Sequence, residues 1–324
     1  MNIKLKTLLP DKKTLLIISL LSLFSGVLSC IAGDILLPIS IGLLSVLYLF
    51  DDNKYKPFAI SVSIILLIIN IVCVLQGITV SLFAPSSVIL AIILCFGFSR
   101  RVTKSDIAYL MTVVCALFSL ISCFLLAMME QGEFTLDAVI VFYTELYDSF
   151  RTVFVENMMK LYTASGIQLT EEILVSLLDA QVDLITSYLL IGGFVTVGIA
   201  IKLFGFIVSR LIEEKKDILE WRFEASSIFA YAYVALSLIS VFISFSDSVI
   251  AIPVLNLYNL FLVIFAYIGF NFATTILKMR MKTWLSILIL IVLLVAFSSF
   301  TIQVLAMLGA MFTIRNNKFK VFKS

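Results

Sequence analysis

The stretch "IAYLMTVVCALFSLISCFLLAMM", residues 107 to 129, contains no charged residue over 23 positions. About 20 consecutive apolar residues are enough for a helix to cross the roughly 30 Å hydrocarbon core of a bilayer. Lipid offers no hydrogen-bond partners, so the backbone of such a segment must satisfy its own polar groups, as a helix does. The stretch therefore predicts a membrane-spanning helix.

Apolar segments of this kind recur along the chain, which is 62% hydrophobic and 14% charged over 324 residues. That is more apolar surface than one soluble core of this length can bury. The segments number about ten, at 15–33, 35–50, 57–76, 80–98, 107–129, 184–208, 225–245, 249–277, 284–297 and 300–312. We predict an all-α, polytopic membrane helix bundle with eight to ten spans.

The last two segments have 14 and 13 residues, fewer than one span needs. A single tilted helix through both would place the basic tail "IRNNKFKVFKS" across the membrane from the basic loop "KMRMK". We therefore predict a hairpin that turns at "SSF", residues 298–300, and forms either two short spans or a re-entrant pair.

The basic residues predict the orientation, because cytoplasmic loops carry an excess of lysine and arginine. With a cytoplasmic N-terminus, 20 of the 23 basic residues fall on the inner side. The exceptions are Arg151, Lys160 and Lys202, and Lys202 can extend from the sixth segment to the inner interface. We expect a multi-pass protein of the cell membrane with both termini in the cytoplasm.

Three regions follow from this topology. Residues 1–129 form an N-terminal membrane bundle, 130–183 an extracytoplasmic acidic region, and 184–324 a C-terminal membrane bundle with a basic cytoplasmic tail. The middle region carries ten acidic residues against Arg151 and Lys160. It does not resemble a membrane span, and we predict two outer amphipathic helices between segments five and six.

The first outer helix is predicted in "FTLDAVIVFYTELYDSFRTVFVENMMKLYTA", before a break at "ASGIQ". Its apolar stripe at helical spacing consists of Val139, Tyr143, Leu146, Phe150, Val153 and Leu161. Its polar stripe consists of Glu145, Asp148, Thr152 and Glu156. The helix is therefore amphipathic.

The second outer helix is predicted to begin at Thr170, a suitable N-cap, with Glu171 and Glu172 in its first turn. A polar ribbon then runs along one face toward the sixth segment, formed by Glu172, Ser176, Asp179, Asp183 and Ser187. Two interpretations stay open. The outer helices are a lid with a solvated acidic face, or Glu172, Asp179 and Asp183 steer a cation or a cationic solute.

Several chemistries are not expected. The five cysteines lie in apolar runs without CxxC spacing and the chain has no histidine, so we expect neither a metal site nor a cofactor. The motifs GxxxxGK, HExxH and GxSxG are missing, so we do not expect an enzyme. A formal charge of +2, with basic residues only in short loops, does not favour nucleic-acid binding.

Polar residues inside the segments are candidate ligand-binding positions, because they are costly in lipid and usually find a partner. Asn256, Asn259 and Asn271 lie in the eighth segment, and Asn70 and Gln76 lie in the third. They form either a small-molecule site or a set of interhelical hydrogen bonds.

The first segment carries a stripe of small residues that includes Ser22, Gly26 and Cys30. Such a stripe lets another helix approach closely. That helix belongs either to the same bundle or to a separate membrane partner.

The C-terminal third, with "EWRFEASSIFAYAYV", "LNLYNLFLVIFAYIGFNFATTILKMRMK" and "LAMLGAMFTIRNNKFK", resembles the YybS-like family of predicted bacterial membrane proteins. The matching positions are Trp221, Arg222, Asn259, Gly269, Gly309 and Arg315. The chain departs from the family pattern at Glu224 and Thr313, where a proline and an acidic residue are common.

The family has no assigned function, but it is distantly similar to the substrate-binding membrane subunits of energy-coupling-factor transporters. The resemblance implies a transport-type subunit that lacks its own ATPase, binds a small solute and associates with an energising subunit or another membrane protein. The alternative is a non-enzymatic membrane scaffold that binds other envelope proteins.

Overall fold

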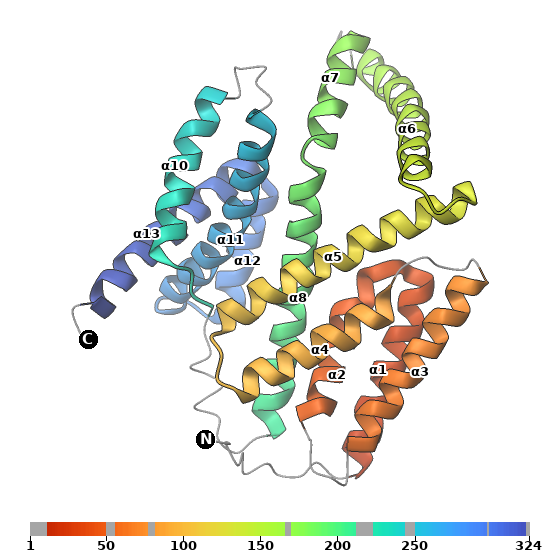
Figure 1. Ribbon diagram of the computed structural model, residues 1–324. Helices are drawn as coiled ribbons and strands as arrows, with labels where there is room; N and C mark the ends of the chain where they lie inside the picture. The colour runs from red at the N-terminus through yellow and green to blue at the C-terminus, as the bar shows by residue number, and fades with distance from the viewer. Residues whose placement is uncertain are drawn as a thin grey trace. The chain divides into compact units, whose positions relative to one another are not determined.

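The computed structural model describes residues 12–49, 56–76, 82–165, 170–211, 223–243, 250–296 and 298–321. Every regular element among these residues is a helix, as the sequence predicts (Figure 1). The helices form two compact units. The first contains Met1–Ile185 and Gly192–Trp221, and the second contains Thr186–Ile191 and Arg222–Ser324.

The first unit is built around a short buried helix. Its elements are α1 (Lys12–Ala32), the 3-10 helix η1 (Gly33–Leu36), α2 (Leu37–Leu49), α3 (Lys56–Leu75), α4 (Phe83–Ser99), α5 (Lys104–Gln131), α6 (Leu136–Ala164), α7 (Glu171–Val182) and most of α8 (Ile185–Leu211). Almost every residue of α2 is buried, with α1, α3 and α4 packed around it. This position explains why α2 is apolar on all sides.

Glycines allow α8 to pack closely in the first unit. A Cβ added at Gly42 of α2 would lie 3.2 Å from the carbonyl oxygen of Ala200 on α8. A Cβ added at Gly193 of α8 would lie 3.1 Å from the carbonyl oxygen of Thr112 on α5. Small residues at such positions let helix backbones approach one another, as is common in membrane bundles.

The second unit contains α10 (Ser227–Ile243), α11 (Ala251–Lys278), α12 (Thr283–Ala296) and α13 (Ser298–Val321). The closest pair is α11 and α13, which cross at Gly269 and Gly309. Tyr233 of α10 is almost fully buried and lies 5.3 Å from Phe265 of α11, measured between ring centroids. An aromatic core therefore joins α10 to the α11 and α13 pair.

Ten apolar helices correspond to the ten predicted segments, although they differ in length. Five of the described helices are long and apolar enough to cross a membrane: Phe58–Leu75, Lys104–Gln131, Ile185–Leu211, Ala251–Lys278 and Ser298–Asn316. Five others are shorter: Lys13–Ser29, Leu37–Leu49, Ala84–Ser99, Ser227–Phe242 and Trp284–Ala296. The length and composition are those of a multi-pass integral membrane protein, while the predicted eight to ten spans stay a prediction.

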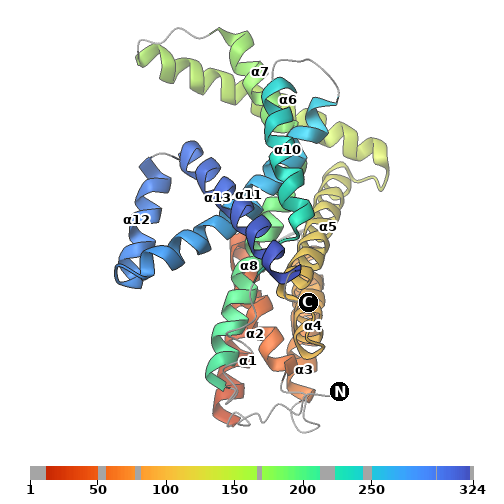
Figure 2. The same ribbon diagram turned by 90° about the vertical axis from the view of Figure 1, so that its left-hand side faces the viewer.

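The chain changes direction between α12, which ends at Ala296, and α13, which begins at Ser298 (Figure 2). The predicted interruption therefore exists, but it precedes the "SSF" stretch, whose three residues form the first turn of α13. Thr301 donates a hydrogen bond of 3.0 Å to the carbonyl oxygen of Leu293, eight residues earlier. In one continuous helix these residues would be about 12 Å apart along the axis, so a single helix through both segments is excluded.

The predicted end of the last segment was wrong. We expected 13 residues ending at Phe312, but α13 continues to Val321 and is long enough to span a membrane. The basic and amide residues after Phe312 lower the hydropathy without interrupting the helix, because lysine, arginine and asparagine are all tolerated in a helix end.

The topology can be checked by thiol labelling in a variant without the five native cysteines. We expect a single cysteine at Glu145 to react with a membrane-impermeant reagent in whole cells, because the acidic helices are predicted to lie outside. A cysteine at Lys320 should react only after permeabilisation. Labelling of residue 320 in intact cells would contradict the predicted orientation.

Candidate functional site

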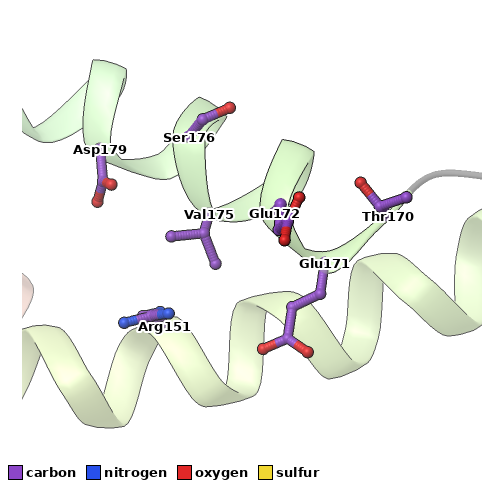
Figure 3. A pocket seen from close by; sticks show the side chains of 7 residues that line it. All are labelled: Arg151, Thr170, Glu171, Glu172, Val175, Ser176 and Asp179. Atoms are coloured by element: carbon purple, nitrogen blue, oxygen red, sulfur yellow. The ribbon is translucent and has the colours of Figure 1, made fainter.

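Helices α6 and α7 pack against each other, and an open groove of about 620 Å³ lies between them. Figure 3 shows its lining, in which Arg151 comes from α6 and the other six residues come from α7 and its N-cap, Thr170. The lining residues are Arg151, Thr170, Glu171, Glu172, Val175, Ser176 and Asp179.

Capping residues fix both walls of the groove. The Thr135 hydroxyl accepts a hydrogen bond of 3.1 Å from the Ala138 amide at the start of α6. The Thr170 hydroxyl accepts one of 3.4 Å from the Ile173 amide at the start of α7. The predicted N-cap at Thr170 is confirmed, and it places Glu171 and Glu172 in the favourable first turn of α7.

A side-chain hydrogen bond joins the two walls. The Tyr147 hydroxyl on α6 donates to Oδ1 of Asp179 on α7. This hydrogen bond raises the pKa of Tyr147, so the phenol remains a donor to higher pH than an ordinary tyrosine. Tyr147 on α6 is hydrogen-bonded to Asp179 on α7, and Arg151, four residues later on α6, lies opposite the earlier residue Val175 of α7 (Figure 3), so the two helices run antiparallel.

The lining of the groove carries a net negative charge. Three carboxylates (Glu171, Glu172 and Asp179) and one guanidinium (Arg151) give its lining a formal charge of −2. In the described part of the chain no carboxylate lies within ion-pair distance of Arg151, so both charge types are available to a ligand. Among the described residues no group of three or more His, Cys, Asp or Glu side chains could hold a metal ion.

The structure gathers only part of the predicted polar ribbon. Glu172, Ser176 and Asp179 all line the groove, although the Ser176 hydroxyl points away from α6 (Figure 3) and donates to the Ile173 carbonyl oxygen at 2.9 Å. Asp183 is exposed beyond the end of α7. The ribbon is thus not continuous into α8, contrary to the prediction.

The ribbon is broken because the helix itself ends. α7 stops at Val182 and α8 begins at Ile185. The Asp183 amide still makes a helical hydrogen bond of 2.9 Å to the Asp179 carbonyl oxygen, but the Leu184 amide donates to Gln181, only three residues earlier, at 3.2 Å. Ser187, the last member of the predicted ribbon, is buried. Regular four-residue spacing in the sequence therefore did not guarantee one continuous helical face.

Sequence reasoning did not select Glu171 and Arg151 for this site. Arg151 is an exception to the distribution of basic residues, and it is one of only two basic residues on α6, with Lys160. That exception was the available signal. Only the antiparallel packing of α6 on α7 places this side chain opposite the acids.

The apolar stripe of α6 is covered only near its start. Val139 is buried, and the half-buried Tyr143 donates a hydrogen bond of 2.9 Å to the Cys123 carbonyl oxygen on α5. Partial burial raises the pKa of Tyr143 to about 12, so this hydroxyl also remains a donor to higher pH than an ordinary tyrosine. The rest of the stripe is 51–58% exposed: Leu146, Phe150, Val153 and Leu161.

The polar residues predicted as a ligand site belong to different units. In the first unit, Asn70 is buried on α3 and Gln76 is exposed just after the end of α3. In the second unit, α11 carries Asn256, Asn259 and Asn271. The 15 residues between Asn256 and Asn271 correspond to about 22 Å along α11, too far for one small solute. A ligand role for these residues stays a prediction.

Asn256 has a defined partner within the second unit. Its Oδ1 accepts a hydrogen bond of 2.8 Å from the backbone amide of Ser187, and its Nδ2 donates to the Ile252 carbonyl oxygen at 3.0 Å. Ser187 is the third residue of α8, so its amide is one of the four at the helix start that lack an intrahelical acceptor. Asn256 thus caps α8 from another helix.

The small-residue stripe of α1 faces its own unit. Ser22 is fully buried, and a Cβ added at Gly26 would overlap the Leu66 side chain of α3. The side chain of Cys30 lies outside the described residues. Where the structure describes it, the stripe serves packing of α1 on α3.

Comparisons of this sequence with family models, curated proteins and solved structures give no match. The resemblance to the YybS-like family therefore stays a prediction.

Proposed function

We propose that this protein is the solute-binding membrane subunit of a transport system, and that the groove between α6 and α7 receives a cationic solute. The observation that carries the proposal is the placement of three carboxylates around a groove of about 620 Å³. This volume is within the ~300–1,000 Å³ typical of small-molecule sites.

Charge supports a cationic solute. A concave surface of one dominant sign raises the local concentration of opposite charges and speeds their association. Arg151 lies on the opposite wall from the acids, so a solute with an amine and an acceptor group fits the lining better than a bare metal ion.

The proposed subunit has no ATPase of its own. The sequence lacks the GxxxxGK loop that cradles nucleotide phosphates, so transport would be energised by a separate protein. We propose that partner on the resemblance to energy-coupling-factor systems, and we propose no enzymatic activity for this chain.

A second function is favoured by the exposed apolar stripe of α6. Leu146, Phe150, Val153 and Leu161 offer a surface to an apolar segment of another envelope protein, as a scaffold would. The two functions differ in the part of α6 that they use. Solute binding uses the side chains that line the groove, whereas a scaffold uses the exposed apolar stripe.

The experiment compares two pairs of charge-neutralising variants in purified protein. Glu172→Gln with Asp179→Asn removes two carboxylates from the groove, and Glu156→Gln with Asp183→Asn removes two outside it. With 1,4-diaminobutane and lysine as probes, we expect the groove variant to associate about tenfold more slowly at 0.01 M salt. This difference should shrink at 0.1 M, as the Debye length falls from about 30 to about 10 Å.

Tyr147→Phe provides the structural control, because it removes the hydrogen bond to Asp179 and keeps every charge. Its association rate should match that of the parent protein. Equal rates for the groove variant and the parent at 0.01 M salt would refute the groove as a solute site and favour the scaffold.

A further inference from the structure

A second groove, of about 340 Å³, lies between α11 and α13. Its lining is Phe272, Leu308, Met311, Phe312, Arg315 and Asn316. Four of these side chains are apolar, and the only charge is the guanidinium of Arg315.

The groove follows from the way the two helices cross. Added Cβ atoms at Gly269 and Gly309 would collide with the carbonyl oxygens of Leu305 and Phe265, so the backbones meet at these glycines. Beyond the crossing the rings of Phe272 and Phe312 stack with centroids 4.6 Å apart. They form one wall of the groove, which leads to Arg315.

The two helices run in parallel, because contacts progress in the same direction along both: Phe265 and Gly269 face Gly309, and Phe272 faces Phe312. The ends of α11 and α13 that follow the crossing therefore lie on the same side. Lys278 and Arg280 are exposed at the end of α11, and Arg315 is exposed in α13.

The two ends of the groove therefore differ in polarity. Its deep part is apolar and belongs to helices long enough to span a membrane, whereas its mouth is basic. Basic side chains at the end of a spanning helix mark the membrane–water interface, and on the predicted topology this is the cytoplasmic interface. Apolar side chains are exposed here, such as Met311 at 67%, and on this placement they would contact lipid rather than water.

We propose that this groove binds a phospholipid with an anionic headgroup. An acyl chain would lie against Leu308, Met311 and Phe312, and the phosphate would accept hydrogen bonds from Arg315 and Asn316 at the mouth. The charge of Arg315 and the exposed Lys278 and Arg280 select an anionic headgroup over a zwitterionic one. The proposal does not depend on the solute groove of α6 and α7.

The test measures lipid retention by native mass spectrometry of the full chain, titrated with phosphatidylglycerol or with phosphatidylcholine of identical acyl chains. We expect tighter binding of phosphatidylglycerol. Arg315→Gln should weaken that binding about fivefold, the factor corresponding to ~1 kcal/mol for one basic residue at an anionic surface. Arg315→Lys keeps the charge and should lose less.

Arg210→Gln is the matched control, because Arg210 is an exposed arginine in the last turn of α8, above the ring of Phe206. It should leave phosphatidylglycerol binding unchanged. Equal retention of both lipids by the parent protein, or equal losses from the Arg315→Gln and Arg210→Gln variants, would overturn the site.

A second measurement locates the acyl chain. In a Trp221→Phe and Trp284→Phe background, Met311→Trp should be quenched more strongly by phosphatidylglycerol brominated on its acyl chains than by brominated phosphatidylcholine. Displacement of the lipid by glycerol phosphate alone at equal concentration would show a site for a soluble phosphate and would also overturn the proposal.

Discussion

Replacing Gly309 with alanine is expected to lower the free energy of unfolding by about 2–3 kcal/mol, the upper part of the usual range for overpacking a core. An added Cβ at this position would overlap the carbonyl oxygen of Phe265 and would lie 2.8 Å from the Gly269 amide nitrogen. Both obstacles are backbone atoms of α11, which no change of side-chain rotamer can move away. The helices would have to separate.

Separation would affect the whole second unit, because α11 and α13 form its closest contact and α10 packs against both. In lipid, helix association depends on close packing. The hydrophobic effect cannot compensate for the lost contact between α11 and α13, because lipid tails are as apolar as the side chains. The measurement is reversible unfolding in mixed micelles by a denaturing detergent, followed by circular dichroism.

Gly198→Ala is the matched control for Gly309→Ala. Gly198 lies inside α8, and an added Cβ there would meet no described atom within 4 Å. Alanine has a higher helix propensity than glycine, so this variant should be unchanged or more stable by up to about 1 kcal/mol. A Gly309→Ala variant as stable as the Gly198→Ala variant would contradict the close crossing.

The helices themselves could be predicted from the sequence, because long apolar runs in lipid have few alternatives to a helix. The turn between α12 and α13 was also predictable, since the basic residues of "KMRMK" and of the tail excluded one continuous span. The length of α13 was not. Hydropathy locates where a helix leaves the membrane, and the helix continues past Phe312 into polar sequence.

The candidate site was only half predictable. The acids of α7 could be placed on one face from their spacing, and Thr170 could be placed at its start. The opposite wall could not be predicted, because nothing local in the sequence indicates that Arg151 lies opposite Val175 (Figure 3). Packing between helices depends on contacts that spacing along one helix does not encode.

The partner of a polar residue in an apolar segment could not be predicted from the sequence either. Asparagines in an apolar segment indicate that a partner exists, and Asn256 does have one. The identity of that partner, the Ser187 amide 69 positions earlier in the chain, could not be derived from periodicity. The assignment of residues 186–191 to the second unit agrees with this hydrogen bond.

Replacing Asn256 with leucine is therefore expected to destabilise the protein by about 1 kcal/mol. The variant removes the acceptor of the Ser187 amide, and interhelical hydrogen bonds in membrane bundles average about 0.6 kcal/mol with a maximum near 1.7. We place the expected value above the average because Ser187 is fully buried, so water cannot replace the lost acceptor.

Asn259→Leu separates capping from ligand binding. Asn259 is on the same helix, less than one turn away, and is half-buried, but only Asn256 reaches the start of α8. If Asn256 is a cap, the Asn256→Leu variant alone should lose stability, and solutes that co-purify with the parent should remain bound to both variants. If the asparagines bind a solute instead, both variants should lose it while their unfolding free energies stay within about 0.5 kcal/mol of the parent's, as is usual for substitutions away from structural contacts.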